Sequence, residues 1–416
     1  MQKKNFQIFI GILILIVLYA PKDFVIDRVA RQWLYLSIIN LGALSYNLFL
    51  SFKGKLESFK IPASLKIFSI LFIWAVLSAL YSLSFQITVI DLSRLFIYLI
   101  TFYNLLIVFN EVKISFKQIS YLFTILFICE IFVSYQDFYL IISQVGGYEN
   151  FNSNSIKGIA ANVNITSFSI ALKVPFLIYL FFKEKSRLLK TVFITLIILG
   201  YVLLNFLDTR AITLSNYLIL FLIFGFAVIN FNRKIFLKSI ILILAIFSSF
   251  NLPSLINSKR TDKTQELISL TKENDQSSNQ RIRYYRSGIK HIINNPILGV
   301  GFGNWKLESI KYDKEYAIEY IVPYHMHNDF LQFGAELGLV GLILYMLFFV
   351  SGFSKYLIDI KNFKIRYDLK ALVVLLFFTY LFFDSNLNFP FARPMVYIQF
   401  LIFIAFLENQ RKKDSL

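Results

Sequence analysis

Cysteine and charge are both scarce in this sequence. The one cysteine, Cys129, lies inside an apolar run, which excludes a disulfide framework and a metal site built from cysteines. Charged residues make up 16% of the chain, against about 25% in an average soluble protein. The glycine patterns that cradle nucleotide phosphates are also missing, because Gly299, Gly301 and Gly303 match neither fingerprint spacing.

Apolar residues are abundant instead. They make up 57% of the chain, and phenylalanine alone occurs 47 times. A soluble domain of this size cannot bury that much apolar surface. The formal charge of +17 would suggest nucleic acid in a soluble protein, but in a membrane protein basic residues gather in cytoplasmic loops. The sequence therefore predicts a membrane protein with the lipid bilayer as its surroundings and no nucleic-acid partner.

Apolar runs of the right length recur along the chain. A helix needs about 20 apolar residues to cross a bilayer, and helices are expected because the backbone in lipid must satisfy its own hydrogen bonds. The twelve predicted spans lie at 5–20, 33–50, 66–84, 88–109, 119–136, 166–182, 189–206, 211–230, 235–250, 334–353, 370–386 and 391–407. We expect an all-α polytopic membrane protein whose first span is not cleaved, because no small-residue cleavage site follows it.

Basic residues indicate the orientation of the spans. The termini and the loops on their side carry most of the lysines and arginines, whereas the short loops on the other side carry few, among them Arg210 and Arg393. The positive-inside rule then places both termini in the cytoplasm. This gives three predicted regions: spans one to nine at 1–251, a large extracytoplasmic loop at 252–326, and spans ten to twelve at 327–416.

The large loop contains an amphipathic pattern from Arg281 to Asn295, ended by Pro296. The apolar residues that would share one helical face are Ile282, Tyr285, Ile289, Ile292 and Ile293. The basic residues elsewhere on the helix are Arg283, Arg286 and Lys290. The pattern predicts a helix at the membrane surface whose basic residues suit lipid or sugar phosphates.

Ionisable residues within predicted spans are costly and are therefore a sign of function, and Asp91, Arg94 and Lys173 lie in two such spans. Asp91 and Arg94 are three residues apart and would share one helical face. A mutual ion pair that holds the helices together is the favoured interpretation for them. Lys173 precedes Pro175 and has no assigned role.

Two further groups combine polar residues at the ends of spans. Arg210 could bind a phosphate through its planar fork or could anchor the span at the interface. His325, His327 and Asp329 alternate, so they could hold a metal ion if extended. Structural polar residues at the start of a helix are the favoured interpretation, because no fourth ligand is in view.

The motifs together resemble the O-antigen ligase and O-antigen polymerase superfamily of bacterial membrane glycosyltransferases. Three residues depart from the usual pattern: Tyr285 replaces a tryptophan, Val163 a proline and Thr209 a serine. The matching segments are Asn-Val-Asn at 162–164, Asp-Thr-Arg at 208–210, Arg-Ile-Arg-Tyr-Tyr at 281–285, Asn-Pro-Ile-Leu-Gly-Val-Gly-Phe-Gly at 295–303, His-Asn-Asp-Phe-Leu-Gln at 327–332 and Glu-Leu-Gly-Leu-Val-Gly at 336–341.

The resemblance implies an inverting enzyme that uses neither a metal ion nor a cofactor. It would transfer a glycan from a polyprenyl diphosphate carrier to an acceptor hydroxyl, of lipid A core or a similar glycan or glycolipid, at the outer face of the bacterial inner membrane. The implied catalytic residues are His327, Arg281 and Arg210. Further residues expected to contact substrate are Arg283, Arg286, Asn328, Asn164 and His325.

Two alternatives remain open at this stage. A polymerase that joins lipid-linked repeat units needs the same leaving-group chemistry, so these residues cannot separate it from a ligase. A flippase or other transporter of lipid-linked oligosaccharides would also have many spans with buried charges. The long loop with its basic helix favours the enzyme, because alternating access does not require such a loop.

Overall fold

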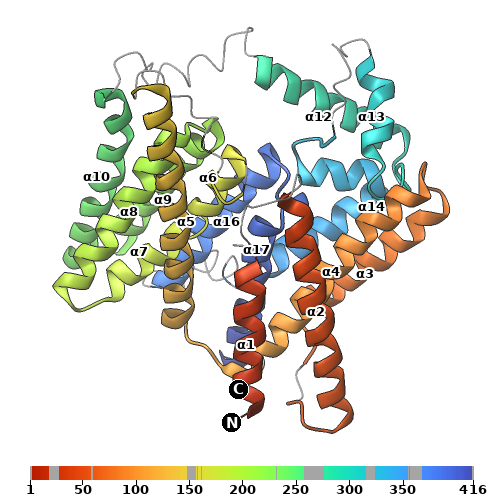
Figure 1. Cartoon of the computed structure of the whole chain (residues 1–416), viewed down its shortest axis with the longest axis horizontal. Helices are drawn as coiled ribbons and strands as arrows, with labels where there is room; N and C mark the ends of the chain where they lie inside the picture. Colours follow the sequence, from red (N-terminus) through yellow and green to blue (C-terminus); the bar gives the residue numbers. More distant parts are fainter. Residues whose placement is uncertain are drawn as a thin grey trace. The chain divides into compact units, whose positions relative to one another are not determined.

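The chain forms two compact units in the computed structural model, and all regular structure in the described residues is helical (Figure 1). Unit 1 comprises Met1–Lys113, Asn274–Ser354 and Ser385–Leu416, and unit 2 comprises Ile114–Glu273 and Lys355–Asp384. The structure describes residues 2–17, 28–57, 60–147, 156, 158–160, 162–230, 232–256, 276–314, 324–354, 356 and 368–414. Each unit joins segments that are far apart in sequence. The three predicted regions at 1–251, 252–326 and 327–416 are continuous in sequence, and this division stays a prediction.

The helices divide between the two units. Those of unit 1 are α1 (Gln2–Val17), α2 (Arg28–Phe52), α3 (Ala63–Leu77), η1 (Ser78–Leu80), α4 (Phe85–Val112), α12 (Gln276–Asn294), α13 (Trp305–Asp313), α14 (Asp329–Ser351), η5 (Pro390–Ala392) and α17 (Pro394–Asp414). Those of unit 2 are α5 (Phe116–Val145), α6 (Val163–Ala171), α7 (Val174–Lys183), α8 (Arg187–Leu207), α9 (Arg210–Asn230), α10 (Arg233–Ile256) and most of α16 (Leu369–Leu387).

Many of these helices suit a membrane. Nine stretches within the described residues are long and apolar enough to cross a bilayer, and Pro394–Gln410 is a shorter apolar helix. The all-helical, polytopic class predicted from the sequence is therefore supported. The count of twelve spans stays a prediction.

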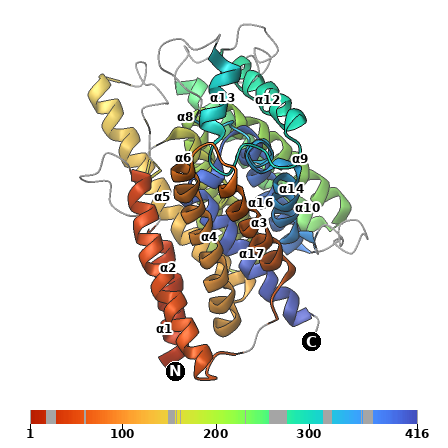
Figure 2. The ribbon, with the colours of Figure 1, turned by 90° about the vertical axis from the view of Figure 1, so that its right-hand side faces the viewer.

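Buried amides connect the N-terminal helices of unit 1. Helix α4 packs against α1, α2, α3 and α17, and α1 lies beside α2 (Figure 2). The Gln7 amide donates to Asn47 at 2.7 Å, and the Asn47 amide donates to Asn104 at 3.1 Å. The Asn104 amide in turn donates to the Asn40 carbonyl at 3.0 Å. Hydrogen bonds of this kind hold apolar helices together where burial alone gives little preference for one partner.

Unit 2 contains a fully buried ion pair that gives Lys173 a partner. Lys173 lies at the break between α6 and α7, and its ammonium pairs with Glu130 on α5. The ammonium also donates to the Ser169 carbonyl at 2.7 Å, and the Ser169 hydroxyl donates to Glu130 at 3.1 Å. Because the ammonium and one carboxylate oxygen are paired within the same unit, the pair holds α5 against the broken span.

Helix α14 is broken at Gly338, and the glycine-rich segment before α13 fills the break. Gly338 has φ 70° and ψ −173°, so the carbonyls of the preceding turn lose their helical partners. Val300 and Gly301 donate their N–H groups to the carbonyls of Ala335 and Glu336 at 3.0 and 2.9 Å. Leu339 donates to the Pro296 carbonyl at 2.7 Å. Two of the recognised motifs therefore fold into one structure.

Replacing Gly338 by alanine is expected to destabilise unit 1. Its backbone occupies a region that essentially only glycine adopts, at a cost of roughly 1–3 kcal/mol for other residues, and an added Cβ would collide with the Ile297 carbonyl. We expect the thermal unfolding midpoint in detergent to fall by several degrees. Gly42→Ala is the matched control, because a Cβ at Gly42 meets nothing within 4 Å. Equal midpoints for both variants would contradict this account.

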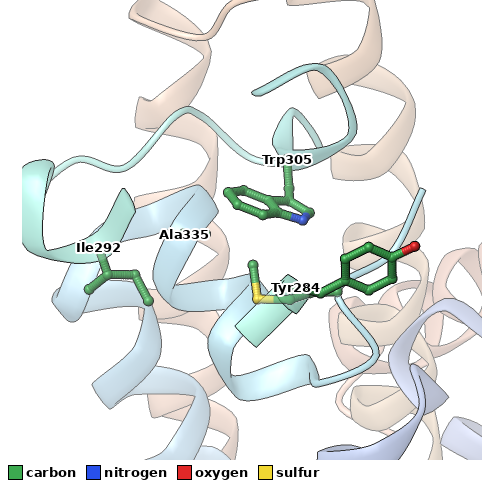
Figure 3. Packing of buried hydrophobic residues seen from close by; sticks show 5 residues of the cluster. Tyr284, Ile292, Trp305 and Ala335 are labelled. Carbon is green, nitrogen blue, oxygen red and sulfur yellow. The ribbon is translucent and has the colours of Figure 1, made fainter. Parts of the chain in front are cut away.

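The amphipathic helix predicted at Arg281–Asn295 is present as α12, and one flank of it packs inside unit 1. Its buried side chains meet those of neighbouring segments in one apolar cluster: Tyr284, Ile292, Trp305, Met326 and Ala335. Figure 3 shows the indole of Trp305 above the side chains of Ile292 and Tyr284. Ile282, Ile289 and Ile293 are instead exposed. These three isoleucines belong to the predicted apolar face, whose place at a membrane surface stays a prediction. Ile292 of that face is covered, because α13 and α14 pack against the helix.

Candidate functional site

A cavity in unit 1 collects ionisable and aromatic side chains from α2, α4, α13, α14 and η5; we refer to it as the unit 1 cavity. Its polar lining residues are Asp91, Arg94, Lys306, Tyr324, His325, Asp329, Gln332 and Glu336. Its aromatic lining residues are Trp33, Phe302, Phe333 and Phe391. A concave site with a few convergent polar groups on an apolar wall is the usual form of a ligand site.

The two motif histidines lie at the edge of this cavity, around the ring of Phe389. The His325 ring stacks on Phe389 with centroids 4.4 Å apart, and His327 meets the same ring edge-on at 4.9 Å. The Arg393 guanidinium lies 5.0 Å from that ring. One phenyl ring thus holds two imidazoles and a guanidinium in a single cluster.

The local backbone explains how His327 is presented. His327 has a φ of 56°, which is uncommon for a residue other than glycine. Asn328 then caps α14, because its side-chain oxygen accepts the Leu331 N–H at 3.0 Å. The helix consequently begins at Asp329, and His327 lies in the irregular segment before it.

Both histidines are kept neutral by their surroundings. Burial, together with the positive charge of Arg393, lowers the pKa of His325 to about 3. Burial lowers the pKa of His327 to about 4, with Arg281 and Arg393 adding to the effect. Among the described residues, neither Nδ1 atom has a hydrogen-bond partner. A neutral imidazole with a bare nitrogen can accept a proton.

Tyr285, the residue that replaces the usual tryptophan, connects α12 to the segment that contains His327. The Tyr285 hydroxyl lies 2.9 Å from the His327 carbonyl and 2.6 Å from the Asn386 carbonyl. Burial raises the pKa of Tyr285, and the positive charge of Arg281 opposes that rise. The same charge lowers the pKa of His327. The charge of Arg281 therefore acts on His327, 46 positions further along the chain, within unit 1.

The other predicted contact residues of unit 1 differ in their surroundings. Arg283 is half-buried, with its guanidinium 5.6 Å from the Tyr284 ring, whereas Arg286 is exposed. The Asn328 amide is engaged by the fold, because besides capping α14 it donates to Asn386 at 3.3 Å. Their contacts with substrate stay predictions.

The remaining predicted residues belong to unit 2. Arg210 begins α9, directly after Asp208, which ends α8 in a left-handed conformation with φ 55°. Asn164 lies in the first turn of α6, which is capped by Asn162. The meeting of Arg210 and Asn164 with the histidines stays a prediction.

Arg393, Asp91 and Lys306 are the charged residues that the motifs missed. Arg393 carried one signal in the sequence, because it is a basic residue on the side where few are expected. Asp91 was assigned only an ion pair with Arg94, and that pair is confirmed at 2.7 Å. Its second partner, Lys306 at 3.4 Å, lies 215 positions away.

The carboxylate of Asp329 does not join the histidines in the fold. Its Oδ2 accepts the Phe391 N–H at 3.0 Å and lies 3.4 Å from the Tyr345 hydroxyl. Within the part of the chain that the structure describes, no group of three or more histidine, cysteine, aspartate or glutamate side chains is placed to hold a metal ion.

Comparison with known proteins bears directly on this site. The family model described as O-antigen ligase matches residues 192–346, a range that contains Arg210, Arg281 and His327. No curated protein matches the chain. The resemblance carried by the motifs is confirmed over residues 192–346, which match the O-antigen ligase family.

Proposed function

We propose that the chain is a membrane glycosyltransferase that moves a glycan from a polyprenyl diphosphate carrier to an acceptor hydroxyl. The observation that carries the proposal is that the Tyr285 hydroxyl joins α12, the helix that contains Arg281, to the His327 carbonyl at 2.9 Å, inside the range matched by the O-antigen ligase family. The polyprenyl carrier, and the reaction at the outer face of a bacterial inner membrane, come from the motif resemblance.

The residues suit the steps of such a transfer. The acceptor hydroxyl attacks the anomeric carbon as the bond from that carbon to the diphosphate oxygen breaks, which inverts the configuration. His327 takes the proton of the attacking hydroxyl. Negative charge grows on the departing diphosphate, and the guanidiniums of Arg281 and Arg210 stabilise it through paired hydrogen bonds in a poorly hydrated site.

A ligase is favoured over a polymerase by the description of the matching family. The two differ in what the cell accumulates. Deleting the gene of a ligase would leave long lipid-linked polymer unattached to its acceptor. Deleting the gene of a polymerase would leave single repeat units attached to the core. Single repeat units attached to the core would therefore favour the polymerase over the ligase.

Transfer by the purified protein tests the proposal. The full chain is reconstituted in lipid vesicles with a labelled polyprenyl-diphosphate glycan and a candidate glycolipid acceptor. We expect a labelled glycosylated acceptor to form and polyprenyl diphosphate to be released in equal amount. A transporter would move the donor across the vesicle without making a new glycosidic bond, and that result would refute the enzyme.

Metal removal should leave the reaction unchanged. His327, Arg281 and Arg210 supply a base and positive charge without a divalent cation, so we expect the same initial rate with and without a chelator. The rate is measured in the vesicle assay above. A loss of rate that added magnesium or manganese restores would contradict the expected metal-independent mechanism.

A further inference from the structure

We propose that the unit 1 cavity binds a sugar ring of the acceptor glycan, and that Asp91 and Lys306 hold the hydroxyls of that ring. That the bound sugar belongs to the acceptor rests on the proposed function. Saccharide binding itself can be tested without any transfer. The Asp91, Arg94 and Lys306 cluster has no part in the mechanism above.

The polar groups form a continuous row along the cavity. The Arg94 guanidinium donates to Asp91 Oδ1 at 2.7 Å, and the Lys306 ammonium lies 3.4 Å from Asp91 Oδ2. The same ammonium lies 3.0 Å from the Tyr324 hydroxyl. Donors and acceptors therefore alternate along the row. Adjacent sugar hydroxyls, each of which donates and accepts, match such an alternation.

The pair of Asp91 and Lys306 differs from a pair that only holds helices together. Glu130 and Lys173 in unit 2 are completely buried, and both form a hydrogen bond with the Ser169 hydroxyl. The side chains of Asp91 and Lys306 keep 16% and 13% of their surface exposed while they line the cavity, and their contact is long. Exposed surface of this kind is available to a ligand.

The fold makes room for Asp91 at the wall of the cavity. Gly303 approaches so closely that a Cβ on it would collide with the Asp91 carboxylate. The Gly303 N–H donates to Glu336 at 2.8 Å, which fixes this approach. The last glycine of the recognised motif thus seats one of the two proposed binding residues.

Aromatic rings complete the chemistry of a sugar site. Trp33 and Phe391 line the cavity, and the Arg94 guanidinium lies 5.8 Å from the Trp33 ring. The apolar C–H face of a sugar packs on such rings while its hydroxyls meet the polar row. A diphosphate fits this lining poorly, because the carboxylates of Asp91 and Asp329 also line the cavity and would repel it.

The position of the cavity favours the acceptor. His325 lines it, and the Phe389 ring on which His325 stacks also contacts His327. A sugar in the cavity therefore lies beside the proposed base. Arg281 is not part of the lining, and its positive charge acts on His327. The diphosphate of the donor would bind to Arg281, outside the cavity.

Binding of simple glycosides by the purified full chain is the first test. The probes are the methyl glycosides of glucose, galactose and N-acetylglucosamine at millimolar concentration, measured by calorimetry in detergent. We expect at least one to bind, and Asp91→Asn and Lys306→Met each to weaken it by about tenfold or more, as expected for a lost hydrogen bond to a charged group. Lys311→Met is the matched control, because Lys311 on the same helix pairs with Glu308 at the surface.

Several outcomes of this test would overturn the proposal. They are failure of all three glycosides to bind the wild-type chain, equal binding by the Asp91 and Lys306 variants, or binding of inorganic pyrophosphate that depends on Lys306. Lys306→Arg serves as a second variant if Lys306→Met does not fold. It keeps the charge, so recovery of binding would support a direct contact with the ligand.

A charge swap separates binding from a purely structural pair. If Asp91 and Lys306 only hold α4 to α13, Asp91→Lys combined with Lys306→Asp should restore wild-type glycoside binding, and that result would overturn the proposal. In the transfer assay, Asp91→Asn should raise KM for the acceptor about tenfold while KM for the donor stays unchanged. Glycoside binding without transfer would refute the enzyme and leave the saccharide site standing.

Discussion

Replacing His327 by alanine is expected to reduce kcat for glycan transfer by about a hundredfold or more, the usual contribution of a positioned base. The imidazole is neutral, carries a bare Nδ1 within the described part of the chain and lies beside Arg281. Binding of the donor should change little, because the guanidinium remains. The measurement is the single-turnover rate of the purified variant with saturating donor.

His291→Asn is the matched control for this variant. His291, on α12, is also buried, and burial lowers its pKa. Its ring packs against Trp305 and Tyr312. Its loss should lower the thermal unfolding midpoint and leave kcat of the folded protein near the wild-type value. A His327→Ala variant with wild-type kcat would remove the proposed base.

The pH dependence of the wild-type reaction gives the same assignment a second readout. A pKa of about 4 means that His327 in the free protein stays neutral until the pH falls to about 4. The acid limb of kcat/KM, which reports the free protein, should therefore lie near pH 4. An anionic diphosphate beside Arg281 favours the imidazolium and raises its pKa. The acid limb of kcat, which reports the complex, should consequently lie at a higher pH.

The sequence could predict what hydropathy and local motifs encode. The helical membrane class follows from long apolar runs, and the ion pair of Asp91 with Arg94 follows from a spacing of three on one helix. The family resemblance also indicated that the motif segments of unit 1 lie together, as the contacts of Tyr285 with His327 and of Val300 with Ala335 show. Each of these features depends on neighbours in the chain or on a recognised pattern.

Features that depend on distant contacts could not be predicted. The partners of Asp91 and Lys173, which are Lys306 and Glu130, lie on other segments with no periodic relation to them. The break at Gly338 is invisible to hydropathy, because the apolar run continues through it. The buried flank of α12 depends on which helices cover it, and Arg393 joins the histidines only through Phe389.

Removing Arg281 is the second change with a large expected effect. Loss of one donor to a developing negative charge costs about a hundredfold to a thousandfold in kcat, so Arg281→Ala should lose at least that much. Arg281→Lys should recover little, because an ammonium is a point charge that cannot form two parallel hydrogen bonds to phosphate oxygens. Single-turnover rates with saturating donor measure both variants. Near-complete recovery in the lysine variant would contradict paired recognition.

The double variant Arg210→Ala with Arg281→Ala tests whether the two guanidiniums serve one diphosphate. Residues that act as a unit show non-additive losses, because removing the first already disables the arrangement. We therefore expect the double variant to lose little more than the more damaged single variant. The control pair is Arg281→Ala with Arg187→Ala, since Arg187 begins α8, the helix that ends beside Arg210. If the fold-loss in rate of the double variant equals the product of the two single losses, Arg210 and Arg281 act in separate places. His327 would then work with Arg281 alone.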